Sequence, residues 1–284
     1  MEKGKLYLCA TPIGNLDDIT IRVLNTLKSV DLIAAEDTRH SIKLLNHFEI
    51  KKPMTSYHEY NKVEKAIELV DKMLDGANIA LITDAGTPGI SDPGEELVRR
   101  SLEAGVSVTS LPGACAGIVA LTSSGQKTRR FCFEGFLPTD KKELEQVLEN
   151  LKEETRTIIL HEAPHHLLRT LKLLYENLGN RSISICRELT KKFEEIEKTD
   201  IESAIKKYEE KEPKGEFVLV IEAKSFEEKI KEEQESWKET EISKHIEFYL
   251  NQGIDKKEAF KLVAKDRGIS KRDVYSYYEE NMKE

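Results

Sequence analysis

Residues 79–96 read IALITDAGTPGISDPGEE and contain, in order, a strand signal, a shaped loop and the start of a helix. The run Ile79–Thr83 is apolar up to its last residue, as in a strand that is buried on both faces of a sheet. Three glycines and two prolines follow within residues 83–94, and glycine lets a ligand approach the backbone closely. Asp92 then offers a helix cap, with Pro93 at the first helical position. The stretch predicts a buried strand that leads into a ligand-binding loop.

The same alternation of apolar strands and amphipathic helices extends on both sides of this stretch. The neighbouring strand runs are Leu6–Ala10, Leu32–Ala35 and Val106–Leu111. The helices between them are expected to be capped by Asp18, Ser41 and Asn61. Continuous apolar strands that are separated by helices indicate a mainly parallel sheet covered on both faces.

A second unit with the same alternation begins near residue 113. Its strand runs are Phe131–Phe136, Thr157–Leu160, Ile183–Cys186 and Glu216–Glu222. Residues 225–239 are highly charged and nearly featureless, which is typical of a linker. A chain of 284 residues suits two compact domains and an appendage. We therefore predict an α/β protein with domains at 1–112 and 113–224, a linker at 225–239 and a helical extension at 240–284.

The extension carries two capping-box patterns. Asp255 is followed by Glu258, Ser270 is followed by Asp273, and Gly268 stands between the two pairs. This arrangement resembles a helix-turn-helix with glycine in its tight turn. Two roles remain open for the extension, which are contact with nucleic acid and a packing or dimerisation role.

The formal net charge of −8 argues mildly against bulk nucleic-acid binding, but local basic patches decide whether RNA is contacted. Two concentrations of cations stand out in the sequence. The RNA-binding residues that they predict are Lys127, Arg129, Arg130, Lys265, Arg267, Lys271 and Arg272. Solvated helix faces are the alternative interpretation of each patch.

The sequence also bears on location. No stretch approaches the ~20 apolar residues of a membrane span, and Leu6–Ala10 is too short for the core of a signal peptide. The four cysteines lack Cys-x-x-Cys spacing, which favours buried thiols in a reducing compartment. We therefore expect a cytoplasmic protein without a membrane partner.

Three loops with unusual composition each follow a strand run. They are residues 11–18, residues 35–40 and residues 83–94. In open α/β sheets, ligands bind beyond the carboxyl ends of the strands. Tight turns alone would explain one such loop, whereas three at one sheet edge favour a ligand site.

The chemistry of these loops narrows the ligand class. The fingerprints GxxxxGK[ST] and GxGxxG are both absent from their expected places, which disfavours a nucleoside triphosphate or a dinucleotide. Asp84 at the end of a strand would repel phosphate, but it suits a sulfonium, amine or hydroxyl group. A positively charged cofactor is therefore favoured.

His161-Glu162-Ala163-Pro164-His165 matches the HExxH zinc-protease pattern. Zinc binding there requires both histidines on one face of a continuous helix. The four residues before His161 are strand-like, and Pro164 suits the start of a helix rather than its interior. We therefore predict a strand-end loop that faces a cleft, and no metal.

Several motifs together resemble the ribosomal RNA small subunit methyltransferase I family. They are TPIGNLDDIT at 11–20, AEDTR at 35–39, DAGTPGISDPG at 84–94, LPGA at 111–114, FEGFLP at 133–138 and RELTK at 187–191. The match runs in order from about residue 5 to 223. This chain departs from the family at His161 and His166, because the family usually shows an aromatic residue before the glutamate and an arginine after the histidine of its Glu-Ala-Pro-His motif. These two histidines would change how a cofactor packs against the Glu-Ala-Pro-His motif.

The resemblance implies two α/β domains of the tetrapyrrole-methylase type, S-adenosyl-L-methionine in the cleft between them, and a homodimer. It also implies 2′-O-methylation of a cytidine in the decoding region of small-subunit (16S) ribosomal RNA, acting on the RNA or on the assembled small subunit. Two alternatives remain. A tetrapyrrole (precorrin-type) methyltransferase would share the cofactor site, whereas a non-catalytic RNA-binding assembly protein would have no cofactor affinity.

Methyl transfer from a sulfonium is an in-line displacement, so its main requirement is the alignment of the nucleophile, the methyl group and the sulfur. The residues expected to surround the cofactor are Pro12, Gly14, Asp84, Gly86, Thr87, Pro88, Cys115, Ala116, Glu162 and Arg187. A ribose hydroxyl needs a proton acceptor as it attacks. The catalytic candidates are Glu36, Asp37 and His58 as acceptors, with Arg39 positioning a phosphate or orienting a carboxylate. An ion pair between Asp37 and Arg39 that only orders the loop is the alternative.

Overall fold

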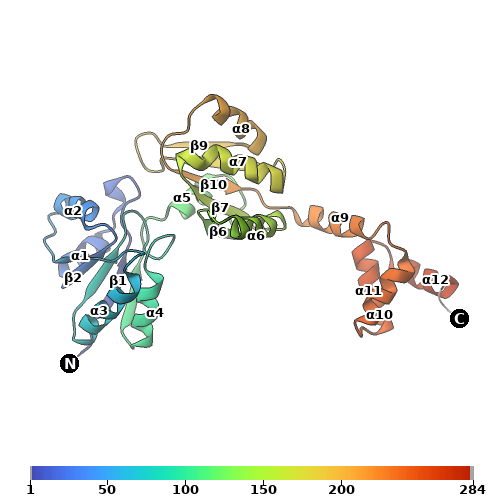
Figure 1. The fold of residues 1–284 in the computed structure, drawn as a ribbon, viewed down its shortest axis with the longest axis horizontal. Coiled ribbons are helices and arrows are strands. Elements are labelled where there is room, and N and C mark those ends of the chain that lie inside the picture. The colour runs from blue at the N-terminus through green and yellow to red at the C-terminus, as the bar shows by residue number, and fades with distance from the viewer. Residues whose placement is uncertain (1, 282–284) are drawn as a thin grey trace. The chain divides into compact units, whose positions relative to one another are not determined.

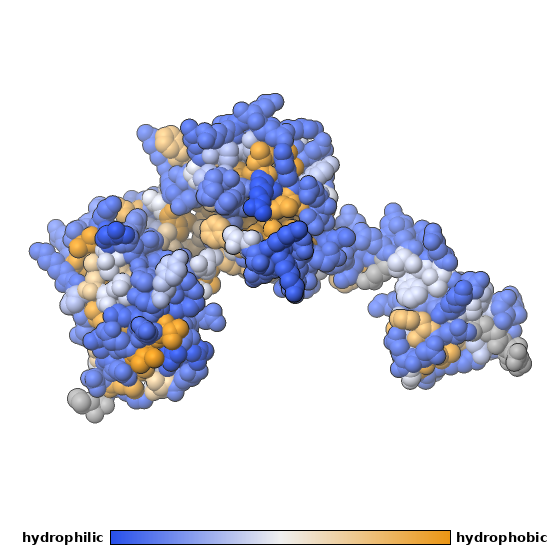
Figure 2. Space-filling model, viewed as in Figure 1, coloured by the Kyte–Doolittle hydropathy of each residue, from blue (hydrophilic) through white to orange (hydrophobic). Residues whose placement is uncertain are grey.

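The computed structural model describes residues 2–281, and within them the chain forms two five-stranded sheets followed by a helical segment (Figure 1). Both sheets belong to one compact unit, which comprises the residues up to 149 together with 157–222. Residues 150–156 and 223 onwards form a second compact unit. Hydrophilic side chains dominate the visible surface of each unit (Figure 2), as expected from a charged-residue content of 34%.

The first sheet is entirely parallel, as the continuous apolar runs predict. Its strands are β1 (Lys5–Cys9), β2 (Leu32–Ala35), β3 (Met54–Ser56), β4 (Ile79–Ile82) and β5 (Ser107–Leu111). Their order across the sheet is β3-β2-β4-β1-β5, and every neighbouring pair is parallel. The connecting helices are α1 (Ile21–Ser29), α2 (Thr38–His47), α3 (Lys62–Leu74) and α4 (Glu95–Glu103). The loops after β1, β2 and β4 therefore meet at one edge of the sheet, which we call the carboxyl edge.

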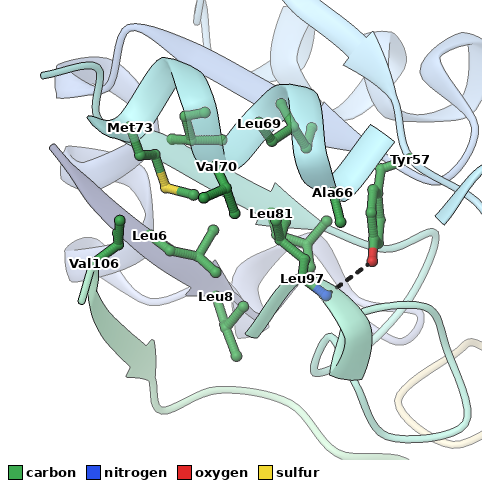
Figure 3. Packing of buried hydrophobic residues seen from close by; sticks show 12 residues of the cluster. Leu6, Leu8, Tyr57, Ala66, Leu69, Val70, Met73, Leu81, Leu97 and Val106 are labelled. Atoms are coloured by element: carbon green, nitrogen blue, oxygen red, sulfur yellow. Dashed lines mark hydrogen bonds between the residues drawn. The ribbon is translucent and has the colours of Figure 1, made fainter. Parts of the chain in front are cut away.

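Alternate residues of each central strand pack into two cores on opposite faces. In β4, Ile79 and Leu81 join the cluster that contains Met73 and Leu97 of α3 and α4 (Figure 3). The other two residues of β4 join a cluster that contains residues of α1 and α2. All four residues of β4 are buried. This two-sided burial is the physical reason why strand signals such as 79–82 are continuously apolar rather than alternating.

Tyr57 joins the first of these cores to the start of α4. Its buried hydroxyl accepts a hydrogen bond from the backbone N–H of Leu97 at 3.1 Å (Figure 3). Burial raises the pKa of Tyr57 to about 12, so the hydroxyl stays protonated. The N-cap residue of α4 is Gly94, which has no side chain to satisfy the free N–H groups of the first turn. Tyr57 therefore supplies the cap from 40 residues away.

We expect Tyr57→Phe to lower the free energy of unfolding by about 1–3 kcal/mol, because it leaves a buried N–H without an acceptor. Urea unfolding at neutral pH measures the change. Tyr60→Phe is the matched control, because Tyr60 is 98% exposed and its substitution should change stability by less than about 0.5 kcal/mol. Equal stabilities for the two variants would show that Leu97 does not depend on the hydroxyl.

The second sheet is mixed. Its strands are β6 (Phe131–Gly135), β7 (Thr157–Glu162), β8 (Ser182–Arg187), β9 (Glu195–Asp200) and β10 (Phe217–Ile221). In the order β6-β7-β10-β8-β9, only the β6–β7 pair is parallel among the described strands of this sheet. Its helices are α5 (Ala116–Ser123), α6 (Lys141–Lys152), α7 (Pro164–Leu178) and α8 (Ile201–Glu210). Because β6 and β7 are parallel, their last residues, Gly135 and Glu162, lie at the same edge of this sheet.

Two helices of the first sheet begin at other residues than expected. Thr20, rather than Asp18, caps α1 by accepting from Val23 N at 3.2 Å. Asp37 caps α2, whereas Ser41 lies inside that helix and is buried. In both cases the side chain that forms the cap stands directly before the first helical residue, which is where a short oxygen-bearing side chain can reach the free N–H groups.

The second compact unit is helical, as predicted for the end of the chain. Its helices are α9 (Phe226–Ser236), α10 (Ile242–Asn251), α11 (Lys256–Arg267) and α12 (Lys271–Asn281). Gly268 separates α11 from α12 with a left-handed φ of 64°, and Ser270 with Asp273 forms the expected capping box. The structure differs at 225–239, where a linker was expected, because α9 occupies most of this segment. In the described part of the chain, no helix is long and apolar enough to cross a membrane.

Candidate active site

A cavity of about 440 Å³ lies at the carboxyl edge of the first sheet, and the second sheet contributes part of its wall. This volume lies within the range of small-molecule sites. The wall from the first sheet consists of residues 13, 85–87 and 90–92. The wall around the second sheet consists of residues 115–116, 136, 161–164, 186, 189 and 216–218. Two of the three loops that stand out by their composition, 11–18 and 83–94, therefore line one hollow, whereas no residue of 35–40 belongs to its wall.

Five of the residues expected to surround a cofactor line this cavity, namely Gly86, Thr87, Cys115, Ala116 and Glu162. The other five do not line it, but each is the immediate chain neighbour of a wall residue: Pro12, Gly14, Asp84, Pro88 and Arg187. The structure thus brings all ten to the same region and separates an inner group from an outer one.

Three hydrogen bonds hold the loops of the cavity together. Thr11 and Gly86 exchange both backbone bonds, at 2.9 and 3.0 Å, which ties the loop after β1 to the loop after β4. The Thr87 hydroxyl donates to the carbonyl of Ala114 at 2.9 Å, next to the start of α5. Gly86 has a φ of 83°, in the left-handed region where a side chain is strained. The glycine in this loop is therefore required by the backbone itself.

The chemistry of the wall is mixed. Ile13, Leu189 and Val218 supply apolar surface, while Asp92 and Glu162 supply carboxyl groups. Glu162 is only 6% exposed and accepts hydrogen bonds from Ala163 N at 2.8 Å and from the Thr170 hydroxyl. Such a wall suits a ligand with a flat apolar part and a positively charged part.

Asp92 is a cavity residue that sequence reasoning assigned to a helix cap. Because the N-cap of α4 is Gly94, the Asp92 carboxyl is free to line the cavity. Burial raises the pKa of Asp92 to about 7, and the Glu36 carboxylate adds to the rise. No local pattern could reveal this, since the environment that shifts the pKa comes from other strands.

The raised pKa predicts a pH-dependent cost to stability. In the folded protein Asp92 keeps its proton up to about pH 7, whereas in the unfolded chain it loses the proton near its ordinary value of 3.8. Stability therefore falls as the pH rises between these two values. We expect Asp92→Asn to be more stable than the wild type at pH 8 by about 1–2 kcal/mol after allowance for solvent screening, with no gain at pH 4. Urea unfolding at both pH values measures this, and an equal gain at the two would contradict it.

Glu36 and Asp84 meet beside Asp92 at the ends of the neighbouring strands β2 and β4. The backbone N–H of Asp84 donates to the Glu36 carboxylate at 3.4 Å, and that of Asp37 donates to Asp84 Oδ1 at 3.3 Å. Burial raises the pKa of Glu36, and the Asp84 carboxylate adds to the rise. His58, after β3, is close enough for its charge to act on Glu36. Its Nδ1 atom is buried and has no hydrogen-bond partner among residues 2–281. Two of the predicted catalytic side chains, Glu36 and His58, thus share this edge with Asp84 and Asp92.

Asp37 has a different environment. Its carboxylate accepts from the Arg39 guanidinium at 3.1 and 2.9 Å and from Arg39 N at 2.8 Å. These hydrogen bonds hold the pKa of Asp37 at about 2. The ion pair between Asp37 and Arg39, which is the alternative to a catalytic role, is therefore present, and it makes Asp37 a weak proton acceptor.

The HExxH pattern falls on two different elements. β7 ends at Glu162 and α7 begins at Pro164, so His161 and His165 do not share a helix. This confirms the predicted strand-end loop. The His161 ring contacts the rings of Phe133 and Phe136 in T-shaped arrangements at 5.1 and 5.6 Å, and burial lowers the pKa of His161. Within the described residues, no group of three or more side chains is arranged to hold a metal ion.

Cys9, Cys115 and Cys186 are free thiols in the described chain. Cys9, Cys132 and Cys186 are buried, whereas Cys115 is partly exposed in the cavity wall. Burial raises the pKa of Cys9 and of Cys186 to about 12, which keeps both thiols protonated. Three of the four therefore fit the expected buried thiols.

The basic residues predicted to bind RNA are not gathered around the cavity. Lys127, Arg129 and Arg130 precede β6, whereas the cavity lies beyond its other end. A strand of five residues separates the two ends by roughly 16 Å. RNA contact by this patch would therefore involve nucleotides away from the cavity.

The remaining basic candidates lie in the second compact unit. Lys265, Lys271 and Arg272 are exposed there. Arg267 instead donates to His245 Nδ1 at 3.1 Å and to the carbonyl of Thr240. These bonds direct the Arg267 guanidinium into its own unit, so its observed contacts are structural.

Comparison of the whole sequence with known proteins gives consistent matches. The family model described as Tetrapyrrole (Corrin/Porphyrin) Methylases matches residues 5–205. The protein named ribosomal RNA small subunit methyltransferase I from Halalkalibacterium halodurans is 48% identical over 277 residues, covering 98% of this chain and 95% of that protein. The protein of the same name from Escherichia coli O157:H7 is 42% identical over 278 residues, covering 97% and 94%.

Solved structures with the same fold are more distant in sequence. A uroporphyrin-III-C-methyltransferase from Thermus thermophilus superposes with a TM-score of 0.55 at 17% identity, covering 77% of this chain and 94% of that chain. A diphthine synthase superposes with a TM-score of 0.61 at 12% identity, covering 77% and 90%. These likenesses establish the two-sheet fold of the first unit.

Proposed function

Because the chain belongs to the ribosomal RNA small subunit methyltransferase I family, we propose that it methylates small-subunit ribosomal RNA. The reaction is 2′-O-methylation of a cytidine in the decoding region of 16S ribosomal RNA, with S-adenosylmethionine as the methyl donor. The observation that carries the proposal is the cavity at the carboxyl edge, whose wall includes residues of the motifs at 11–20, 84–94, 133–138 and 187–191 that resemble the family.

The wall fits S-adenosylmethionine, which supplies a methyl group on a positively charged sulfur. Apolar side chains such as Ile13 and Leu189 suit the flat adenine, and the Asp92 carboxyl suits a positively charged group. Helices α5 and α7 both begin at the cavity, and neither N-cap residue bonds its free N–H groups through a side chain. Such N-termini suit the carboxylate of the methionine part.

We assign the proton acceptor to Glu36. An acceptor works best when its pKa approaches the working pH, so the raised pKa of Glu36 favours it over Asp37, whose carboxylate is bound by Arg39. Glu36 does not line the cavity itself, but its carboxylate is close enough to the wall residue Asp92 to raise the pKa of Asp92. A ribose hydroxyl brought to this side of the cavity would therefore find a carboxylate near the methyl donor. His58, in the loop after β3, would favour the ionised form of Glu36 whenever its ring carries a positive charge.

The partner is the RNA itself or the assembled small subunit. We propose that Lys265, Lys271 and Arg272 contact RNA, while Arg267 holds the second unit together. Lys127, Arg129 and Arg130 would reach RNA outside the target nucleotide. We also propose that the protein acts in the cytoplasm as a homodimer.

Methyl transfer from labelled S-adenosylmethionine onto isolated small subunits and onto naked RNA tests the proposal, followed by mapping of the modified nucleotide. The expected product is one 2′-O-methylated cytidine. Label on a tetrapyrrole precursor and none on RNA would favour the tetrapyrrole alternative. Calorimetry with S-adenosylmethionine distinguishes a methyltransferase from a non-catalytic assembly protein, because the latter would bind no cofactor and release no heat.

A further inference from the structure

Two exposed apolar side chains belong to the cavity wall, one in the loop after β4 and one directly after β6. Phe136 is 57% exposed and Ile90 is 43% exposed, although both line the cavity. Large apolar side chains lose favourable free energy when they face water, and at the rim of a concave site they mark a contact surface. Other wall residues, such as Phe217 and Val218, are buried, and the exposed part of the wall includes Ala85, Ser91 and Glu216 beside these two large apolar side chains.

Phe136 reaches this position because β6 ends irregularly. Its pairing with β7 shifts register between Phe133 and Gly135, and Gly135 has a left-handed φ of 64°. Bulges of this kind re-aim the following side chain and are frequent next to active sites. A Cβ at Gly135 would lie 3.1 Å from the Ser91 hydroxyl, so the turn that carries Phe136 packs directly against the loop that carries Ile90.

The loop that carries Ile90 is held in a conformation that one of its residues rarely adopts. Ser91 has a φ of 64°, in the left-handed region that disfavours side chains. Backbone strain of this kind clusters at ligand-binding positions. On its other side the Phe136 ring meets the His161 ring in a T-shaped contact, which orients it while leaving more than half of its surface open.

We propose that Phe136 stacks on the base of the target nucleotide, with Ile90 completing the apolar platform. This rests on the proposed function, because it supplies the surface that such a substrate needs. RNA bases that are read outside a duplex are splayed out and stacked on aromatic side chains. The buried walls suit the cofactor, whereas a nucleotide that arrives from solvent meets the exposed rim first.

The test compares Phe136→Ala, Phe136→Leu and Phe136→Tyr. Loss of a stacked base typically weakens binding by about 5- to 100-fold, so the KM for small-subunit RNA should rise by that factor in the alanine variant. The leucine variant should fall between alanine and wild type, and the tyrosine variant should approach wild type. Affinity for S-adenosylhomocysteine, measured by calorimetry, should stay within about twofold in all three.

Phe193→Ala is the matched control, because Phe193 is 65% exposed but does not line the cavity. It should leave the KM for RNA unchanged. An unchanged KM in Phe136→Ala would overturn the stacking role, and an equal loss of cofactor affinity would place the ring in the cofactor site instead. If the wild type methylates RNA and Phe136→Ala has the same KM, only the stacking role is wrong and the proposed function stands. A wild type that transfers no methyl group to RNA would overturn both.

Discussion

Glu36→Gln is expected to slow methyl transfer by about 100-fold or more while leaving cofactor affinity nearly unchanged. Glutamine has the same shape and can still accept the hydrogen bond that Asp84 N donates to Glu36, so the loop after β2 should keep its path. What the amide cannot do is take a proton from the ribose hydroxyl as it attacks. Single-turnover transfer from labelled S-adenosylmethionine measures the rate, and calorimetry measures the affinity.

The pH dependence of the methyl-transfer rate is a second test of the role of Glu36. Burial and the neighbouring Asp84 raise the pKa of Glu36, so the wild-type rate should increase with pH until the carboxyl is ionised and then level off. In Glu36→Gln this increase should disappear, leaving only what the titration of Asp92 contributes near pH 7. A variant that keeps the wild-type profile would place the acceptor elsewhere.

Asp37→Asn is the matched control, since it removes one carboxylate one residue away. Asparagine can still cap α2, and the Arg39 guanidinium already keeps Asp37 from accepting a proton readily. We expect it to slow transfer by less than about tenfold. A greater loss in Asp37→Asn than in Glu36→Gln would reverse the assignment of the two residues.

The sequence was sufficient to locate the loops but not to assign every side chain in them. Apolar runs such as 79–82 mark strands because each residue is buried on one face or the other, and this signal is local. Asp92 was assigned to a cap because Asp-Pro is a common start of a helix. The structure replaces that cap with the hydroxyl of Tyr57, which is distant in sequence. Only the fold could reveal that the carboxyl was free for the cavity.

Other features were missed for separate physical reasons. β9 (Glu195–Asp200) lies at the edge of its sheet, and Ile196 is its only apolar residue, so it has no apolar run. The segment 225–239 was assigned to a linker from its charge, although Ser225 and Glu228 form a capping box that was visible in the sequence. The position of Phe136 depends on a register shift between two strands, and no single-strand pattern contains that information.

Ala116→Phe is expected to lower the affinity for S-adenosylhomocysteine by at least about 100-fold, to the point where calorimetry detects no binding. Ala116 is the first residue of α5 and lines the cavity. Small-molecule sites enclose most of their ligand's surface, so a volume of about 440 Å³ leaves little room for an added ring. The ring would also cover the free N–H groups at the start of α5, which we propose to face the cofactor.

Thr122→Phe adds a ring to the same helix on an exposed position outside the cavity wall, so it should bind the cofactor as the wild type does. Urea unfolding of both variants separates lost binding from lost folding, because a folded Ala116→Phe that fails to bind can only be blocked at the site. If instead the folded variant binds with wild-type affinity, the cofactor lies outside this cavity. Glu36 would then have no methyl donor beside it, and the arrangement at the carboxyl edge would need a different ligand.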